Sequence, residues 1–399
     1  MASQLSPFSK EELMPQPEML EVRKNKNQLY IGLPKETHYD EKRICLTPTA
    51  VASLTANGHR IMIESGAGAG TNFTDDQYAE AGAKISYNAN DVFACNIILK
   101  IEPPSFEEIK MINPQSILFS AMQIKTQKKE YYEALALKRV TAFAFEYIQD
   151  SHGLYPIVKS LSEIAGTASI LIASELMNNL NEGNGLLLGN ISGVPPSNVV
   201  IIGAGTVGEF AARSAKGLGA RVEVFDNSLT KLRNLQHKLA YPIATSTIQP
   251  QVLSDSLNRC DVAIGALRGK TRTPVVVTEN MVKNMKDGAV IIDVSIDSGG
   301  VFETSEITTH SKPTLTKYGV IHYCVPNIPS RYSRTASESI SNIFTPYLLD
   351  IGESGGFEQA LRYDKGLQKG MYLYHGVLTN RSISDWFSLP FTDINLLIF

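Results

Sequence analysis

The stretch that decides the fold is residues 198–226, which read NVVIIGAGTVGEFAARSAKGLGARVEVFD. Residues 199–202 form a short β-branched run without a polar side chain, which is typical of a strand buried on both faces of a parallel sheet. An Ala-rich segment at 210–219 predicts a helix, and the apolar run at 222–225 predicts a second strand that ends in Asp226. The stretch therefore predicts a β-α-β unit.

Three glycines at the G-x-G-x-x-G spacing join the first strand to the helix. Gly203 permits the tight turn, Gly205 lets the backbone approach a pyrophosphate, and Gly208 lets helix and strand pack closely. The free N–H groups at the start of the helix then face the phosphates. Asp226 follows about 20 residues on, where a carboxylate accepts the ribose hydroxyls. The unit is predicted to bind a dinucleotide.

The acid at the end of the second strand also favours one dinucleotide over the other. A carboxylate at position 226 repels a 2′-phosphate, so we expect NAD rather than NADP. Arg221 and Lys231 are the nearby cations that complicate this preference.

Composition excludes several classes of protein. A chain of 399 residues has room for two domains, and a net charge of −3 gives no basic excess for nucleic acid. No apolar run is long enough to predict a membrane segment. Four cysteines lie far apart without metal-ligand spacing, so we expect reduced core thiols and no metal site. In the absence of a signal peptide, the expected compartment is the cytoplasm.

Strands and helices alternate along most of the chain, which predicts an α/β fold. Thr47 and Pro48 are the expected N-cap and first residue of an early helix. Apolar runs predict strands at 29–33, 60–64, 97–101, 116–121, 140–145, 261–265, 289–294 and 319–324. A long helix is expected at 155–177, and a helical region broken at two glycines at 337–361. We expect two Rossmann-like domains, each a parallel sheet flanked by helices, with a cleft between them.

Several motifs resemble the family of alanine dehydrogenases and proton-translocating transhydrogenase α-subunits. They are IGLPKET at 31–37, EKR at 41–43, LTP at 46–48, MIESGAGAG at 62–70, LSEIAG at 161–166, GAGTVG at 203–208 and DVSIDSGG at 293–300. Residues 370–391 are closer to alanine dehydrogenase, whereas NIPSR at 327–331 resembles the transhydrogenase more. The resemblance covers roughly residues 29–391.

The resemblance implies domains at 29–155 for substrate and 156–332 for NAD, with 333–399 as C-terminal helices that return to the substrate domain and 1–28 as an N-terminal extension. It implies an NAD-dependent amino-acid dehydrogenase that converts L-alanine, NAD and water to pyruvate, ammonia and NADH. The partner would be a small amino acid or 2-oxo acid, and the subunit would form a homo-oligomer, either a dimer or a hexamer.

The family's site residues carry over position by position. Its substrate-carboxylate arginine falls on Arg43, and its catalytic aspartate, a proton-relay base, falls on Asp297. Asn327 falls beside the nicotinamide. Further cofactor contacts are implied at Ala204, Thr206, Val207, Asn227, Ala266, Leu267, Ile296 and Asp297.

Two positions depart from the family pattern. The family's substrate-binding lysine lies in a Lys-x-Lys-Glu-Pro string, which corresponds here to KIEPP at 100–104. Glu102 stands where the second lysine of the string should be, and Lys100 matches the other lysine, so both are candidate substrate-binding residues. The catalytic histidine that follows a Leu-Phe run is replaced by Gln123. Glutamine forms hydrogen bonds but does not titrate, and a glutamate repels a substrate carboxylate.

These departures leave three interpretations open. The chain is an alanine dehydrogenase, an opine-type or other amino-acid dehydrogenase whose substrate amine faces Glu102, or a non-catalytic NAD-binding or redox-sensing protein. The loop cations Arg268, Lys270 and Arg272 are candidates to restore the missing positive charge. His38, His59, His310 and His322 are not convincing replacements for the catalytic histidine, and we expect His59 on a surface turn.

Overall fold

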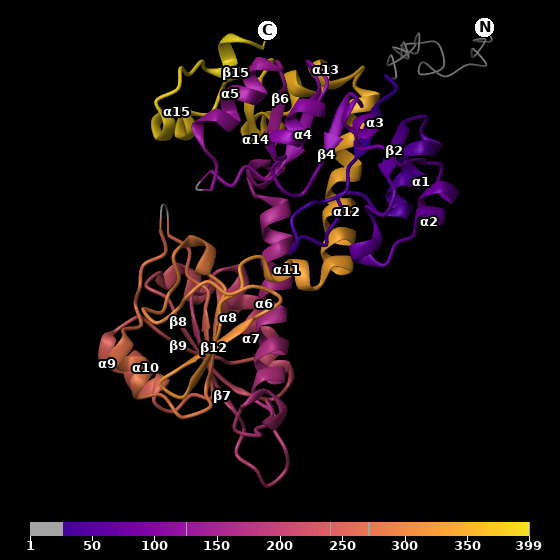
Figure 1. Ribbon diagram of the computed structural model, residues 1–399. Coiled ribbons are helices and arrows are strands. Elements are labelled where there is room, and N and C mark those ends of the chain that lie inside the picture. Colours follow the sequence, from indigo (N-terminus) through magenta and orange to yellow (C-terminus); the bar gives the residue numbers. More distant parts are fainter. Residues whose placement is uncertain (1–26, 125, 240, 270–271, 399) are drawn as a thin grey trace, which may run out of the picture.

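A computed structural model describes residues 27–124, 126–239, 241–269 and 272–398 of the protein, and shows two α/β units stacked end to end (Figure 1). The expected N-terminal extension lies almost entirely outside the described residues, as does Lys270.

The first unit is built on an eight-stranded sheet in the order β15-β14-β6-β5-β4-β1-β2-β3. Its strands are β1 (Tyr30–Leu33), β2 (Arg60–Glu64), β3 (Lys84–Ser86), β4 (Ile97–Leu99), β5 (Ile117–Ser120), β6 (Thr141–Ala144), β14 (Met371–Tyr374) and β15 (Val377–Leu378). Its helices from this part of the chain are α1 (Pro48–Ala56), α2 (Asp75–Glu80), α3 (Ala89–Phe93), α4 (Phe106–Met111) and α5 (Lys129–Leu137). Strands β1 to β6 are parallel, and β14 pairs antiparallel with β6.

The second unit is built on a seven-stranded sheet in the order β12-β13-β11-β10-β7-β8-β9. Its strands are β7 (Asn198–Ile202), β8 (Arg221–Phe225), β9 (Ala244–Ser246), β10 (Val262–Gly265), β11 (Val290–Asp293), β12 (Thr314–Lys317) and β13 (Val320–Tyr323). The flanking helices are α7 (Thr206–Gly217), α8 (Leu229–Lys238), α9 (Pro250–Leu257) and α10 (Glu279–Lys283). All pairs are parallel except β12 with β13. The predicted α/β class with two Rossmann-like units is confirmed, although each sheet carries an antiparallel edge.

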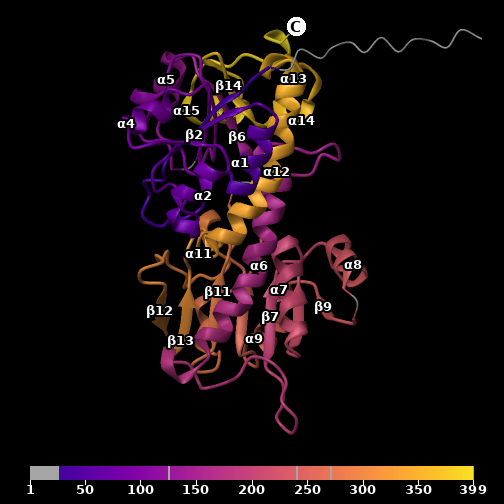
Figure 2. The same ribbon diagram turned by 90° about the vertical axis from the view of Figure 1, so that its right-hand side faces the viewer.

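Two long helices run between the units side by side (Figure 2). They are α6 (Pro156–Leu176), which packs on α7, and α12 (Ser333–Glu353), which follows the short helix α11 (Ile328–Arg331). Beyond α12 the chain adds α13 (Phe357–Tyr363), α14 (Lys365–Gly370) and α15 (Arg381–Phe387), and its strands β14 and β15 extend the first sheet. The domain boundaries given above remain predictions.

Helix α6 is, by length and composition, apolar enough to cross a membrane, with a mean hydropathy of 1.3 and 44% of its most apolar window buried. Its residues Ile170, Ile172 and Ala173 are buried within the core of the second unit. Part of the apolar surface of α6 is therefore buried against that core.

Local predictions had mixed outcomes. The Thr47 side chain caps α1 by accepting from the N–H of Ala50, with Pro48 at the first position, as predicted. All four cysteines are free and buried, as predicted. The expectation for His59 was wrong, because its ring is buried and its Nδ1 accepts from the N–H of Leu29 at 3.3 Å.

Candidate functional site

The loops that follow β1 and β13 meet between the two units. Asn327 lies after β13 and donates from Nδ2 to Oε2 of Glu41 at 2.9 Å. Ser330 in α11 donates from Oγ to the carbonyl of Asp40 at 2.6 Å. These contacts tie the substrate-side loop to the second unit, and they place Asn327 beside the Glu41–Arg43 segment.

The glycine loop of the second unit has the geometry that its spacing predicts. Gly203 has φ 122°, and a Cβ on Gly208 would lie 1.8 Å from the carbonyl oxygen of Gly203. A Cβ on Gly205, by contrast, would meet no atom within 4 Å. Gly205 therefore borders open space in front of the first turn of α7, where a phosphate can approach the backbone N–H groups of Thr206 and Val207.

Ala266 and Leu267 lie against this loop. A Cβ on Gly203 would come within 2.4 Å of the Ala266 carbonyl oxygen and 2.9 Å of the Leu267 nitrogen. The structure therefore brings together the ends of β7 and β10, as the predicted cofactor contacts require.

Asp226 contacts the glycine loop through its side chain. It is 4% exposed, its Oδ2 accepts from the Ala204 N–H at 2.9 Å, and its Oδ1 accepts from the Ser228 N–H at 2.8 Å. The Lys231 ammonium lies 3.8 Å from Oδ2. Each carboxylate oxygen keeps a lone pair for a further donor, so Asp226 can hold the loop and still accept a ribose hydroxyl.

The other residues predicted to contact the cofactor differ in burial. Asn227 is exposed and accepts from the Ile248 N–H at 3.2 Å. Ile296 is buried in a short turn after β11, whereas the neighbouring Asp297 is exposed. Asp297 is thus open to solvent at the carboxyl end of β11, the edge at which parallel sheets bind ligands, although it does not line the cavity described below.

Arg43 is held by a residue that the sequence analysis did not single out. Its Nε and Nη2 donate to the two carboxylate oxygens of Glu41 at 2.8 and 2.6 Å, and Arg43 is only 6% exposed. Burial alone would raise the pKa of Glu41, but the guanidinium outweighs it and the pKa is lowered. Because Glu41 accepts from Nε and Nη2, Nη1 is the guanidinium nitrogen of Arg43 without a hydrogen-bond partner among the described residues.

Lys100 is not brought to the cleft. Its Nζ lies 2.6 Å from Glu36 and 3.4 Å from Glu108, and the side chain is 1% exposed. Burial raises the pKa of Glu36 to about 7, although Lys100 opposes the shift. Glu36 also accepts from the Ile101 N–H at 2.6 Å. Lys100 and Glu36 thus form an internal pair that shapes the loop after β4, which argues against direct contact of Lys100 with substrate.

The two departures from the family pattern, Glu102 and Gln123, contact each other. Gln123 donates from Nε2 to Oε2 of Glu102 at 2.5 Å. Gln123 has φ 45°, and its turn is held by Glu146, which accepts from the Met122 N–H at 2.8 Å. Burial first, and then repulsion from Glu41, raise the pKa of Glu102. The Glu102–Gln123 pair stands at the carboxyl ends of β4 and β5.

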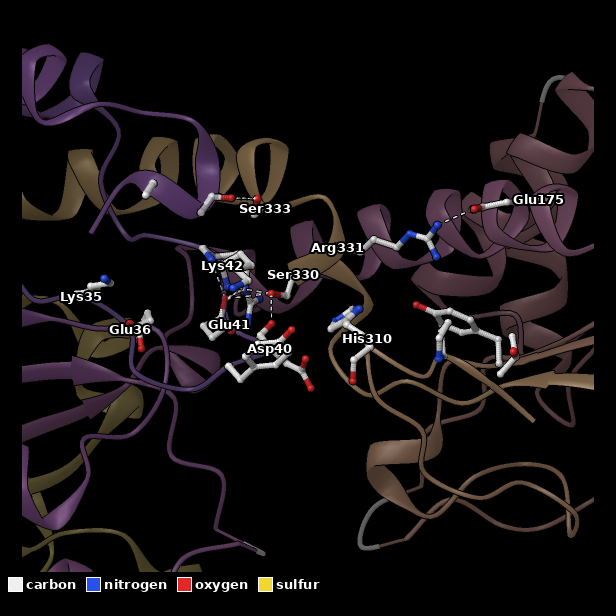
Figure 3. Close-up of a pocket in the computed structure, with 18 of the residues that line it drawn as sticks. Lys35, Glu36, Asp40, Glu41, Lys42, Glu175, His310, Ser330, Arg331 and Ser333 are labelled. Carbon is white, nitrogen blue, oxygen red and sulfur yellow. Dashed lines mark hydrogen bonds and ion pairs between the residues drawn. The ribbon is translucent and has the colours of Figure 1, made fainter. Parts of the chain in front are cut away.

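A cavity of about 920 Å³ opens beside the Arg43 loop (Figure 3). Both units line it: the residues from the first unit include Glu36, Asp40, Glu41 and Arg43, and those from the second include Glu175, His310, Ser330 and Arg331. Sequence reasoning missed Glu36 as a site residue, although it stands inside the IGLPKET motif.

Of the loop cations, Arg268 and Arg272 are described, and both are exposed. Arg268 lies close enough to Glu146 to lower the pKa of that carboxyl, which burial raises. Arg272 packs on the opposite turn, where a Cβ on Gly299 would be 2.8 Å from its Cγ. Neither of them forms an ion pair with Glu102 among the described residues.

Comparison with known proteins finds similarity along most of the chain. Residues 32–165 match the alanine dehydrogenase/PNT N-terminal domain, and residues 169–381 match the C-terminal domain. Alanine dehydrogenase from Staphylococcus epidermidis is 36% identical over 366 residues, which are 91% of this chain and 98% of that protein. Alanine dehydrogenase from Methanococcus maripaludis is 36% identical over 367 residues, with the same coverage.

Solved structures give the same result. An L-alanine dehydrogenase structure superposes with a TM-score of 0.85 at 32% identity, covering 90% of this chain and 99% of that one. A transhydrogenase from Sinorhizobium meliloti shares the fold, with a TM-score of 0.76 at 22% identity, covering 88% of this chain and 99% of that one. The chain belongs to the alanine dehydrogenase/PNT family.

Proposed function

We propose that the protein is an NAD-dependent amino-acid dehydrogenase that converts L-alanine, NAD and water to pyruvate, ammonia and NADH, and catalyses the reverse reaction. The observation that carries the proposal is the 36% identity to alanine dehydrogenases, spread over 91% of this chain and 98% of theirs. This similarity covers both units. It therefore covers the residues that each unit would contribute to a site between them.

The second unit fits NAD. Open space in front of Gly205 suits a pyrophosphate, and Asp226 suits an adenosine ribose without a 2′-phosphate. Residues Gly203, Gly205 and Gly208 form the turn, with Ala204, Thr206, Val207, Asn227, Ala266, Leu267, Ile296 and Asn327 around it. When bound, NAD accepts the hydride from the substrate Cα.

On the substrate side, Arg43 holds the carboxylate through Nη1 while Glu41 fixes its orientation. Asn327 links this arrangement to the second unit through Glu41. Asp297 relays protons at the mouth of the cleft. The loops around Glu102 and Arg43 also exclude water from the carboxylate, because Arg43 is almost fully buried.

The test is a panel of L-amino acids with NAD and with NADP, read as NADH or NADPH absorbance. We expect turnover of alanine with NAD. Turnover only of amino acids with a second amine would favour the opine-type interpretation, because that amine would pair with Glu102. NAD binding without turnover of any amino acid would contradict the proposal and favour a sensor.

We further propose that the protein acts in the cytoplasm as a homo-oligomer, a dimer or a hexamer. Apolar side chains exposed near the foot of the second unit support association: Leu180, Leu187, Ile191 and Val194 are 93%, 66%, 53% and 58% exposed. Exposed apolar clusters of this kind mark interaction surfaces.

A further inference from the structure

Deamination needs a side chain that takes a proton from water and returns one to the leaving nitrogen. The family histidine that would do this is replaced by Gln123, which does not titrate. We propose that Glu102 is the acid–base catalyst of this protein, oriented for proton transfer by Gln123. The inference rests on the proposed function, and it assigns the chemistry to a residue that stands where relatives carry a lysine.

Hydrogen bonding and burial together distinguish Glu102 from the neighbouring carboxylates. Asp40 and Glu146 each keep one oxygen without a hydrogen-bond partner, but those two atoms are buried. Glu41 uses both oxygens on Arg43, and Glu36 uses both on the Lys100 ammonium and the Ile101 N–H. Glu102 accepts from Gln123 through Oε2 only. Its Oε1 has no hydrogen-bond donor among the described residues, so this oxygen is available to a water or an amine.

Position adds to this argument. Glu102 follows β4, the strand next to β1, and Arg43 lies in the loop after β1. Arg43 and Glu41 are both close enough to Glu102 to influence its ionisation. A substrate whose carboxylate reaches Arg43 therefore places its Cα and nitrogen near Glu102.

The surrounding charges suit a group that works in both protonation states. Burial and Glu41 raise the pKa of Glu102, while Gln123, Arg43 and His38 lower it by smaller amounts. Within its own loop, Lys100 is already neutralised by Glu36. Glu102 therefore titrates above the ordinary carboxyl range, and its neutral form does not repel the carboxylate of pyruvate.

The proton steps balance as follows. After the substrate Cα has been oxidised to an iminium, water attacks this carbon and the Glu102 carboxylate takes a proton from the water as the C–O bond forms. Protonated Glu102 then gives that proton to the nitrogen. The C–N bond breaks with its electron pair going to nitrogen, ammonia leaves, and the hydroxyl proton returns to Glu102 as the carbonyl forms. Iminium and water thus become pyruvate, ammonia and one proton on Glu102.

The test separates oxidation from hydrolysis. In rapid mixing of enzyme, NAD and alanine, the Glu102→Gln variant should retain the first-turnover burst of NADH but lose about 100-fold or more in steady-state turnover, the range expected for a lost acid–base group. Glu102→Asp should recover part of that turnover. Glu107→Gln, an exposed glutamate in α4, is the matched control and should behave as wild type. NADH fluorescence titration checks that each variant is folded.

The pH profile gives a second readout. Deamination by the wild type should rise with pH through the Glu102 ionisation, because the base must be unprotonated, and amination of pyruvate should fall through the same ionisation. Gln123→Leu should move this limb to higher pH, since the hydrogen bond from Gln123 favours the carboxylate. Wild-type turnover in Glu102→Gln, or a limb that does not respond to Gln123→Leu, would overturn the proposal. A wild type that oxidises no amino acid would overturn the proposed function and this inference together.

Discussion

At the residue scale, Asp226 has two proposed roles: it stabilises the glycine loop, and it binds the cofactor. Its two oxygens bond the N–H groups of Ala204 and Ser228, so the carboxylate also shapes the turn that begins α7. We predict that Asp226→Ala weakens NAD binding by about 1–3 kcal/mol, the range for lost charge-assisted hydrogen bonds. It should also reduce the preference for NAD over NADP, because the repelling charge is gone. Fluorescence titration with both reduced cofactors measures this.

The matched control is Asp255→Ala, which removes an exposed aspartate from α9 of the same unit. Its affinity for both cofactors should equal that of the wild type. If Asp226→Ala binds NADH as tightly as this control does, Asp226 does not contact the cofactor.

His322 is a residue whose buried state predicts a pH effect on stability. Its ring is 0% exposed, Nδ1 lies 2.9 Å from the Val320 carbonyl oxygen, and Nε2 lies 2.8 Å from the Thr304 hydroxyl. Burial lowers its pKa to about 4. The unfolded chain takes up the proton at about pH 6.5, so the native state loses stability as the pH falls from there towards 4.

This loss amounts to roughly 3 kcal/mol, at about 1.4 kcal/mol for each pKa unit. Urea unfolding at pH 7 and pH 4.5 should therefore show a smaller drop in unfolding free energy for His322→Gln than for the wild type. His152→Gln changes an exposed histidine and should leave the drop unchanged. An equal drop in His322→Gln and the wild type would show that His322 is not the source.

At the element scale, helices α11 and α12 organise the loop that carries Arg43. Backbone N–H groups of Lys42, Ile44 and Thr47 donate to hydroxyls of Ser330, Ser337 and Ser341. Within the part of the chain that the structure describes, this segment pairs with no strand, so the serines replace a ladder of backbone hydrogen bonds.

Ser337→Ala tests this arrangement. It leaves the N–H of Ile44 buried without its acceptor at 2.9 Å, and we expect a loss of about 1–3 kcal/mol in unfolding free energy. The KM for alanine should also rise, because Arg43 is the adjacent residue. Thr335→Ala, at an exposed position of the same helix, is the control. A variant with normal stability and a normal KM would mean that the loop is held by its other contacts.

The elements also show what the sequence could predict. Buried β-branched runs such as Val262–Gly265 were predicted within a residue, because their composition fits a parallel sheet. The edge strands β3, β9 and β12 were missed, since they have three or four residues and mixed polarity. Met371–Tyr374 lacks β-branched residues and falls in the region that the resemblance predicts as C-terminal helices, yet it pairs with the distant strand β6.

The site also contains residues whose arrangement the sequence could predict and residues whose arrangement it could not. Gly203, Gly208 and Asp226 are arranged by one continuous stretch, so their geometry followed from spacing. Lys100 is different, because its partner Glu36 lies 64 residues away and turns it into an internal charge. Nothing in the local sequence around Lys100 reveals that pairing.

At the scale of the whole molecule, the two units are joined by α6, by α11 and α12, and by contacts between their loops, such as Asn327 with Glu41. The foot of the second unit, however, extends away from the first as a loop below β7 (Figure 1). Leu180, Leu187, Ile191 and Val194 expose their side chains in this part of the chain. A single subunit leaves this apolar surface in water, which is unfavourable by about 25 cal/mol for each Å².

We therefore predict that light scattering at micromolar concentration shows a homo-oligomer, and that Leu187→Glu together with Ile191→Glu shifts the mass towards the monomer. Charges at these two positions would be buried without partners in an interface, which is costly, but they are harmless in a free subunit. Leu137→Glu, at an exposed apolar position of the first unit, is the control and should leave the mass unchanged. A monomeric wild type would contradict association altogether, and an oligomer that tolerates the double substitution would place the interface on another face.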